Sequence, residues 1–196
     1  LKNPEAELFI TSPELHPADF GVRLPSFPII RSFSANLGFR KDLYTIRNLS
    51  GRLPKTPFSL AGTISPKPVP ALNLRMAISN LDIDELLPLL TPEQPTAATK
   101  GATRTEPAQP FTLRGQLSAE KGSYGDITFN KLRAQFTNQG GLLQLNDLQT
   151  GVLGGHLAAK GQLEQVSGQP HRWALQVALD RIESDRLLQT LGIDRE

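Results

Sequence analysis

The three histidines are the first side chains to consider for metal binding or acid–base chemistry. His16, His156 and His171 are isolated in the sequence, without acidic neighbours at the spacing of a metal site or of a catalytic triad. Cysteine is absent, which excludes disulfides, thiolate metal sites and thiol catalysis. The pattern predicts surface or turn histidines, and we expect neither a bound metal nor a cofactor.

A group of acidic residues is the next candidate for chemistry. Asp82, Asp84 and Glu85, with Glu183 and Asp185 later in the chain, could act as paired carboxylates in acid–base catalysis. They stand, however, at the predicted starts of two short helices, where carboxylates cap the helix and interact favourably with its dipole. Capping is the favoured interpretation and a hydrolase the weaker alternative. Because the sequence also lacks a nucleophile elbow, a phosphate-binding loop and a dinucleotide fingerprint, we expect no enzymatic activity.

These acids belong to a repeat that ends each half of the chain. NLRMAISNLDIDELLPLL (73–90) aligns without gaps with ALQVALDRIESDRLLQTL (174–191). Alternating apolar residues in the first part of each copy predict a half-buried strand, and leucines at helical spacing in the second part predict a short helix. The expected N-caps are Asp82 or Asp84 in the first copy, and Ser184 or Asp185 in the second. The identical pairs are Leu74 and Leu175, Ala77 and Ala178, Asp84 and Asp185, Leu86 and Leu187, Leu87 and Leu188, and Leu90 and Leu191.

Glycine-centred segments predict further repeated strands. PFSLAGTIS (57–65), PFTLRGQLS (110–118) and GHLAAKGQLE (155–164) share one pattern, and we expect Gly62, Gly115 and Gly161 to let a sheet bend or bulge at regular places. Alternation also predicts strands at 7–10, 34–39, 43–53 and 57–64, and then at 111–119, 124–136, 142–148 and 155–163. The second set is separated by the turn signals EKGS, NQGG and GVLGG, and its short connections predict an antiparallel meander. The expected fold is mainly β: a long, curved antiparallel sheet, forming an open or taco-like groove, with two short helices.

One segment divides the chain. TPEQPTAATKGATRTEPAQ (91–109) has no Leu, Ile, Val or aromatic residue and is rich in Pro, Thr and Ala, so it is expected to be a flexible loop. We therefore expect a first β-rich unit at 1–90 and a second at 110–196, each ending in a short helix.

The alternating apolar residues are expected to share one face of the sheet. Two short helices are too small to cover such a face, and bare apolar surface is unfavourable in water, so the face either packs on another layer or binds an apolar ligand. The residues alone leave both alternatives open, with core packing slightly favoured. The candidate groove residues are Phe58, Leu60, Leu74, Met76, Ile78, Phe111, Leu113, Ile127, Phe129, Leu143, Leu145, Leu157, Trp173, Leu175, Val177 and Leu179.

Overall composition narrows the classes of partner. Lys and Arg number 21 against 19 Asp and Glu, and these charges are scattered without a run that would follow a nucleic-acid backbone, so no nucleic-acid partner is expected. No stretch has the length of about 18 apolar residues that a membrane helix needs. The chain begins at Leu1, and we expect it to be a piece of a longer protein whose anchor or export signal lies elsewhere.

The order of these features, rather than any single motif, resembles a known family. GSYGDITFNKL, GLLQLNDLQTGVLGG and HLAAKGQL, followed by a strand and a D-x-LL helix, resemble the carboxy-terminal region of the AsmA-like family of bacterial envelope proteins over residues 110–192, with 58–90 as a weaker copy. The resemblance implies a periplasmic protein anchored in the inner membrane through a segment absent from this chain. It also implies kinship with bridge-like lipid-transfer proteins, in which a curled sheet forms an apolar groove.

The function implied by the resemblance is phospholipid movement between the inner and outer membranes and support of outer-membrane integrity. The expected partners are a phospholipid or another acyl-chain lipid, the remainder of the same polypeptide and other envelope proteins. The alternative is a structural or protein-interaction β module of the periplasm without lipid cargo.

Overall fold

A computed structural model describes residues 5–16, 28–66, 68–90, 111–164 and 172–183. The predicted loop at 91–109 and the second predicted helix, after Ser184 or Asp185, lie outside these residues.

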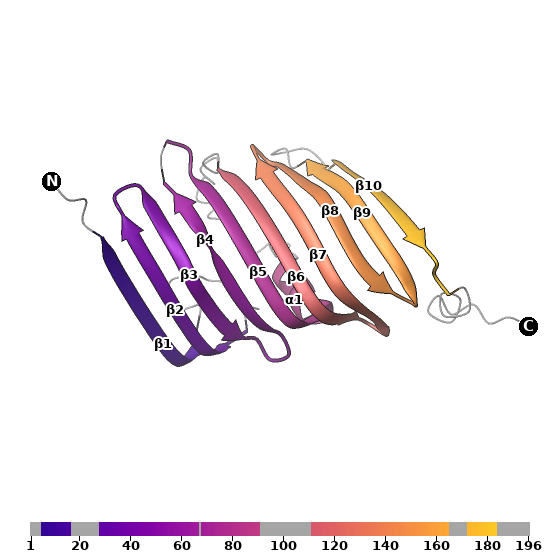
Figure 1. Cartoon of the computed structure of the whole chain (residues 1–196), viewed down its shortest axis with the longest axis horizontal. Coiled ribbons are helices and arrows are strands. Elements are labelled where there is room, and N and C mark those ends of the chain that lie inside the picture. The colour runs from indigo at the N-terminus through magenta and orange to yellow at the C-terminus, as the bar shows by residue number, and fades with distance from the viewer. Residues whose placement is uncertain (1–4, 17–27, 67, 91–110, 165–171, 184–196) are drawn as a thin grey trace, which may run out of the picture.

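All the described strands belong to one open ten-stranded sheet, in which sequence order is also spatial order. Figure 1 shows β1 to β10 side by side from the N-terminal edge to the C-terminal edge. The prediction of a mainly β protein is confirmed. The elements are β1 (Ala6–Leu15), β2 (Ile30–Arg40), β3 (Leu43–Arg52), β4 (Pro57–Ser65), β5 (Ala71–Asp82), α1 (Ile83–Leu90), β6 (Thr112–Tyr124), β7 (Ile127–Gln139), β8 (Leu142–Val152), β9 (Gly155–Glu164) and β10 (Arg172–Asp180).

The sheet is antiparallel at every junction except one. β5 and β6 pair in parallel, from Ala71 opposite Thr112 to Asp82 opposite Ser123. A hairpin cannot join parallel neighbours, and the described part of the connection between these strands is α1. The expectation of a wholly antiparallel sheet is therefore wrong at this junction, although the predicted meander of β6, β7, β8 and β9 is antiparallel throughout.

The turn predicted at EKGS does not exist. β6 continues through Glu120 and Lys121 to Tyr124, and the chain turns at Gly125, whose φ of 54° suits glycine. Glu120 and Lys121 are both exposed, so the inside–outside alternation is interrupted within a continuous strand. Such an interruption in the sequence pattern is typical of a turn, which explains the wrong prediction. The turns predicted at NQGG and GVLGG are confirmed between β7 and β8 and between β8 and β9.

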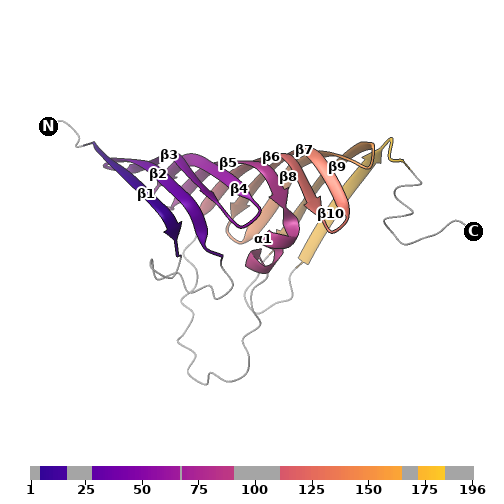
Figure 2. The same ribbon diagram turned by 90° about the horizontal axis from the view of Figure 1, so that it is seen from below.

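Within the described residues, α1 is the only helix, and it packs on one side of the sheet. Figure 2 shows the sheet curling, so that both edge strands slope toward the side on which α1 lies. Ile83 and Leu86 of the helix pack against a buried cluster formed by Ile78, Leu81, Ala119, Phe129 and Leu132. Among the described residues, the buried cluster therefore lies under α1, near one end of strands β5 to β7, and does not extend along the whole sheet.

Candidate functional site

The strand registers align apolar side chains across the entire sheet. Paired residues on neighbouring strands project to the same side, so the registers define which residues share a face. We call the side that carries α1 the apolar face and the opposite side the polar face. Two rows on the apolar face run from β1 to β10: Leu8, Leu37, Ile46, Gly62, Leu74, Gly115, Phe136, Leu145, Gly161 and Leu175, and beside it Ile10, Ala35, Leu49, Leu60, Met76, Leu117, Ala134, Leu148, Ala159 and Val177.

A third row flanks the first on the side away from α1. It contains one amide among otherwise apolar side chains and ends at the indole of the C-terminal edge strand. Its members are Ala6, Phe39, Tyr44, Ile64, Leu72, Leu113, Asn138, Leu143, Leu163 and Trp173. The three rows make the apolar face continuous across all ten strands.

Irregularities in the strands keep these rows on one face. The register shifts between Ile46 and Leu49 in β3 and between Leu145 and Leu148 in β8, so each pair is separated by two residues and yet faces the same side. In β7 a further shift surrounds Lys131, which has a φ of 52°. A slip by one residue would otherwise turn every following side chain to the opposite face, so the bulges preserve the apolar rows.

The repeated glycines are not bulge residues. Gly62, Gly115 and Gly161 are neither in the positive-φ region nor the extra residues of a bulge, so the expectation that they form bulges is wrong. Each stands opposite a large side chain: Gly62 opposite Leu74, Gly161 opposite Leu175, and Gly115 opposite Phe136. A Cβ on Gly115 would overlap the Phe136 ring, whereas a Cβ on Gly62 or Gly161 would overlap a backbone carbonyl of the neighbouring strand, that of Asn73 or of Ala174. Gly115 therefore leaves room for an aromatic ring, and Gly62 and Gly161 let the backbones of β5 and β10 approach closely.

The apolar face becomes more exposed toward β10. The exposed fractions are 75% for Trp173, 52% for Leu175, 52% for Val177 and 53% for Leu179. Between β8, β9 and β10 lies a shallow hollow of about 240 Å³, lined mainly by leucines and by Trp173. Among the described residues only α1 packs on this face, so apolar surface near β10 remains open.

The predicted groove residues divide between this open surface and the core. Ile78 and Phe129 are buried in the cluster under α1, and Phe58 and Met76 pack against that cluster. Phe111 precedes β6 and has no ladder partner, whereas Ile127 pairs with Tyr124 at the first position of β7. The others lie along the apolar face outside the cluster: Leu60, Leu74, Leu113, Leu143, Leu145, Leu157, Trp173, Leu175, Val177 and Leu179.

The groove residues predicted from the sequence do not include the apolar residues of the first three strands. Leu8, Leu37 and Ile46 continue the first row, but β2 and β3 pair with register shifts, which hide the period of two. The sequence does carry one sign of these shifts: Ile46 and Leu49 are three residues apart, as are Leu145 and Leu148. Two apolar residues three apart within a strand pattern indicate a bulge.

The acidic residues near α1 are engaged in separate structural contacts. Asp82 is the N-cap, because its Oδ1 accepts a hydrogen bond from the Glu85 backbone N–H at 3.1 Å. Asp84 accepts the Gly125 N–H at 2.7 Å, and Glu85 accepts the Lys55 N–H at 3.0 Å. The three carboxylates thus bind α1 to the turns on both sides of it. Asp185 lies outside the described residues.

A single ion pair reinforces the cap. Lys55 Nζ lies 3.0 Å from Asp82 Oδ2, and the Asp82 N–H donates to the hydroxyl of buried Thr56 at 3.2 Å. The hydrogen bond from Lys55 lowers the pKa of Asp82, helped by the Glu85 N–H, while the same pair raises the pKa of Lys55. This charge arrangement keeps Asp82 ionised as a capping group.

The remaining chemical candidates do not converge. His156 lies opposite Asp180 and Gly151, which places it on the polar face, and His16 follows β1, whereas His171 lies outside the described residues. No group of three or more His, Cys, Asp or Glu side chains suited to a metal is present within the described part of the chain. None of the described helices is both long enough and apolar enough to cross a membrane.

Comparison with known proteins identifies a family. The family model described as AsmA family matches residues 35–193, which includes the second half of β2, all of β3 to β10, and α1. No curated protein and no solved structure matches the chain.

Proposed function

The chain belongs to the AsmA family, and we propose that it binds the acyl chains of phospholipids on its open apolar face. Membership of this family indicates an envelope-related function, which supports the proposal. The observation that carries the proposal is the exposure of Trp173, Leu175, Val177 and Leu179, in register with apolar rows that cross the whole sheet. Burying a large apolar side chain is favourable by roughly 1.5–3 kcal/mol, and a side chain that stays in water lacks this stabilisation, which favours a bound apolar partner.

The shape of the face suits an extended ligand better than a compact one. The apolar rows run across ten strands, while the deepest packing is confined to the cluster under α1. Neighbouring strands are about 4.8 Å apart, so a row that crosses ten strands is long enough for a flexible acyl chain to lie along it. In this proposal the headgroup stays at the rim in water and the protein carries out no chemical step.

We further propose that this binding serves phospholipid movement between the inner and outer membranes and outer-membrane integrity, in a periplasmic protein anchored in the inner membrane. Family membership supports this part of the proposal. The remainder of the same polypeptide and other envelope proteins would complete the path on either side of the sheet.

In-cell photo-crosslinking tests the lipid contact. A photoreactive amino acid would replace Val177 or Leu145 on the apolar face, with Gln176 on the polar face as the matched control. Phospholipid adducts at the first two positions, and none at Gln176, are expected. Crosslinks from Val177 and Leu145 back into the same chain would show a packed core and overturn the proposal.

The alternative function is a protein-interaction module without lipid cargo. It is favoured by β10, whose nine residues are all exposed and whose outer edge pairs with no described strand. Such an edge can accept a strand from another protein. Adducts to a protein at Val177, without lipid, would support this alternative.

A further inference from the structure

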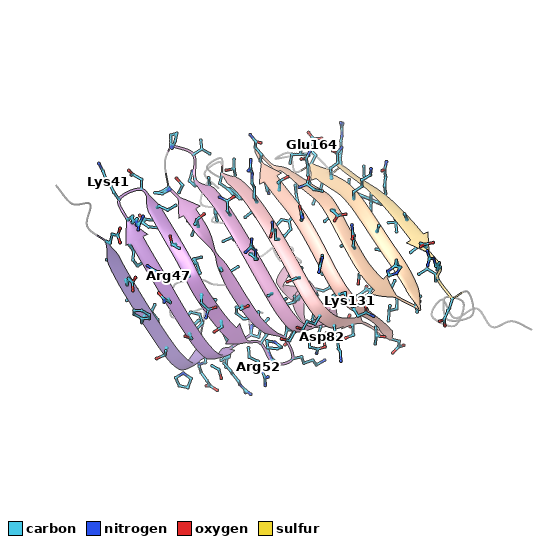
Figure 3. All side chains as sticks on the ribbon, viewed as in Figure 1. Lys41, Arg47, Arg52, Asp82, Lys131 and Glu164 are labelled. Carbon is cyan, nitrogen blue, oxygen red and sulfur yellow. The ribbon has the colours of Figure 1, made fainter. Side chains whose placement is uncertain are left out.

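The polar face of the central strands carries arginines that form no ion pair with a described carboxylate. Closer to the N-terminal edge, each of three arginines forms an ion pair with a glutamate: Arg47 with Glu7 at 2.6 Å, Arg40 with Glu5 at 2.9 Å and Arg31 with Glu14 at 3.7 Å. No carboxylate among the described residues pairs with Arg75, Arg114 or Arg133 on β5, β6 and β7. Figure 3 looks onto this face, on which Arg47 and Arg52 are labelled.

Two of these arginines line a hollow of about 430 Å³. That volume is within the range of about 300–1,000 Å³ found for small-molecule sites. In the parallel pairing of β5 with β6, Arg75 stands opposite Gln116 and Arg114 opposite Asn73, so the arginines are diagonal neighbours on one face. The other polar residues that line the hollow are Thr63, Asn73, Gln116, Gln135, Thr137 and Asn146.

The hydrogen bonds within the hollow leave donors available. Arg75 Nε donates to Gln116 Oε1 at 3.2 Å, which orients the guanidinium and leaves its terminal amino groups unbonded within the described structure. No Asp or Glu lines the hollow. Asp147, opposite Gln135 on β8, instead accepts a hydrogen bond from Gln149 at 3.3 Å. Two guanidinium groups beside several amides and hydroxyls favour a ligand that is both anionic and rich in hydroxyl groups.

The character of this surface disfavours nucleic-acid strands and membrane surfaces. Nucleic-acid strands are bound by aromatic platforms for the bases, and membrane surfaces by apolar side chains next to the cations. Leu74 and Phe136 also line the hollow but belong to an apolar row of the opposite face, whereas the polar-face residues of the hollow are amides, hydroxyls, arginines and small residues. We propose that this hollow binds an acidic glycan, that is, a saccharide chain that carries carboxylate groups. The arginines bind the carboxylates, and the amides and threonines exchange hydrogen bonds with the sugar hydroxyls.

Calorimetric titration of the protein with oligogalacturonate tests the proposal, with a neutral maltooligosaccharide of the same length as the control ligand. At physiological ionic strength, binding of the acidic oligomer alone is expected. The double variant R75Q/R114Q should raise its Kd about tenfold, because it removes both charge-assisted contacts in a solvent-open site. R52Q makes the same charge change on the same face outside the hollow and should leave the Kd unchanged.

Three results would overturn the glycan site: no binding of oligogalacturonate, equal binding of the neutral oligomer, or an unchanged Kd in R75Q/R114Q. A circular dichroism melt would confirm that the double variant is folded, which is expected because both arginines are exposed. Lipid adducts from Val177 lie on the opposite face and should be the same in R75Q/R114Q, so the glycan proposal and the lipid proposal can fail separately.

Discussion

At the scale of single residues, the three repeated glycines determine how the apolar face is built. The ring of Phe136 occupies the space above Gly115, and backbone carbonyls of the neighbouring strands occupy the space beside Gly62 and Gly161. A side chain at Gly115 would compete with the ring for the same volume, and a side chain at Gly62 or Gly161 would push the neighbouring strand away. The glycines are thus packing residues, and their cost in strand propensity is offset by the close approach that they permit.

We predict that Gly115→Ala destabilises the protein by about 1–3 kcal/mol, because its Cβ would overlap the Phe136 ring. The free energy of unfolding from denaturant titration measures this effect. Gly38→Ala is the matched control, since its Cβ would meet no atom closer than 3.5 Å. Equal stability of the two variants would mean that Phe136 has room to move, and the packing role of Gly115 would be refuted.

At the scale of elements, α1 is a cap held by its own acidic residues. Lys55 and Thr56 in the β3–β4 connection contact Asp82, and the β6–β7 turn contacts Asp84. The helix has only eight residues, too few for independent stability, so these contacts and the buried cluster determine its position.

The ion pair of this cap predicts a pH dependence. The pKa of Asp82 is lowered in the folded protein, so its contribution to stability is complete above its ordinary value of 3.8 and is lost as the pH falls through the lower folded value. The pKa of Lys55 is raised, so its contribution is complete below its ordinary value of 10.5 and is lost as the pH rises through the higher folded value. The thermal midpoint of the wild type should therefore decrease in acid more steeply than that of Asp82→Asn.

Thermal melts at a series of pH values measure this difference. Asp126→Asn, on the β6–β7 turn, is the control with the same chemical change and should follow the wild type. If the midpoints of the wild type and Asp82→Asn differ by the same amount at all acidic pH values, the Lys55–Asp82 pair does not stabilise the cap.

At the scale of the whole molecule, the sheet separates two chemistries. One face carries continuous apolar rows, and the other carries amides, hydroxyls and arginines. The two proposals therefore use opposite surfaces, and substitutions can address each surface without touching the other. This separation arises because successive side chains of a strand project to opposite faces. Where this alternation would place apolar residues on the polar face, a bulge returns them to the apolar face.

We predict that lipid co-purifies with the protein and that Leu175→Lys with Val177→Lys removes most of it, as measured by extraction and mass spectrometry. Because both side chains are about half exposed, the stability should change by only about 0.5 kcal/mol. Ala174→Lys with Gln176→Lys adds the same charges to the polar face of β10 and should leave the lipid content unchanged. Undiminished lipid in the first double variant would exclude the β10 end of the apolar face as the binding surface.

The sequence by itself determined the strand repeats, the glycine-centred pattern, most strand positions and the capped helix at 83–90, because these depend on local periodicity and capping chemistry. It also carried the family resemblance, which the match over 35–193 confirms. Only the tertiary structure decided the parallel pairing of β5 with β6, since that pairing joins strands from the two halves of the chain. It also decided which apolar residues are core under α1 and which are open near β10, and it brought Arg75 beside Arg114, because register between distant segments is invisible to local pattern.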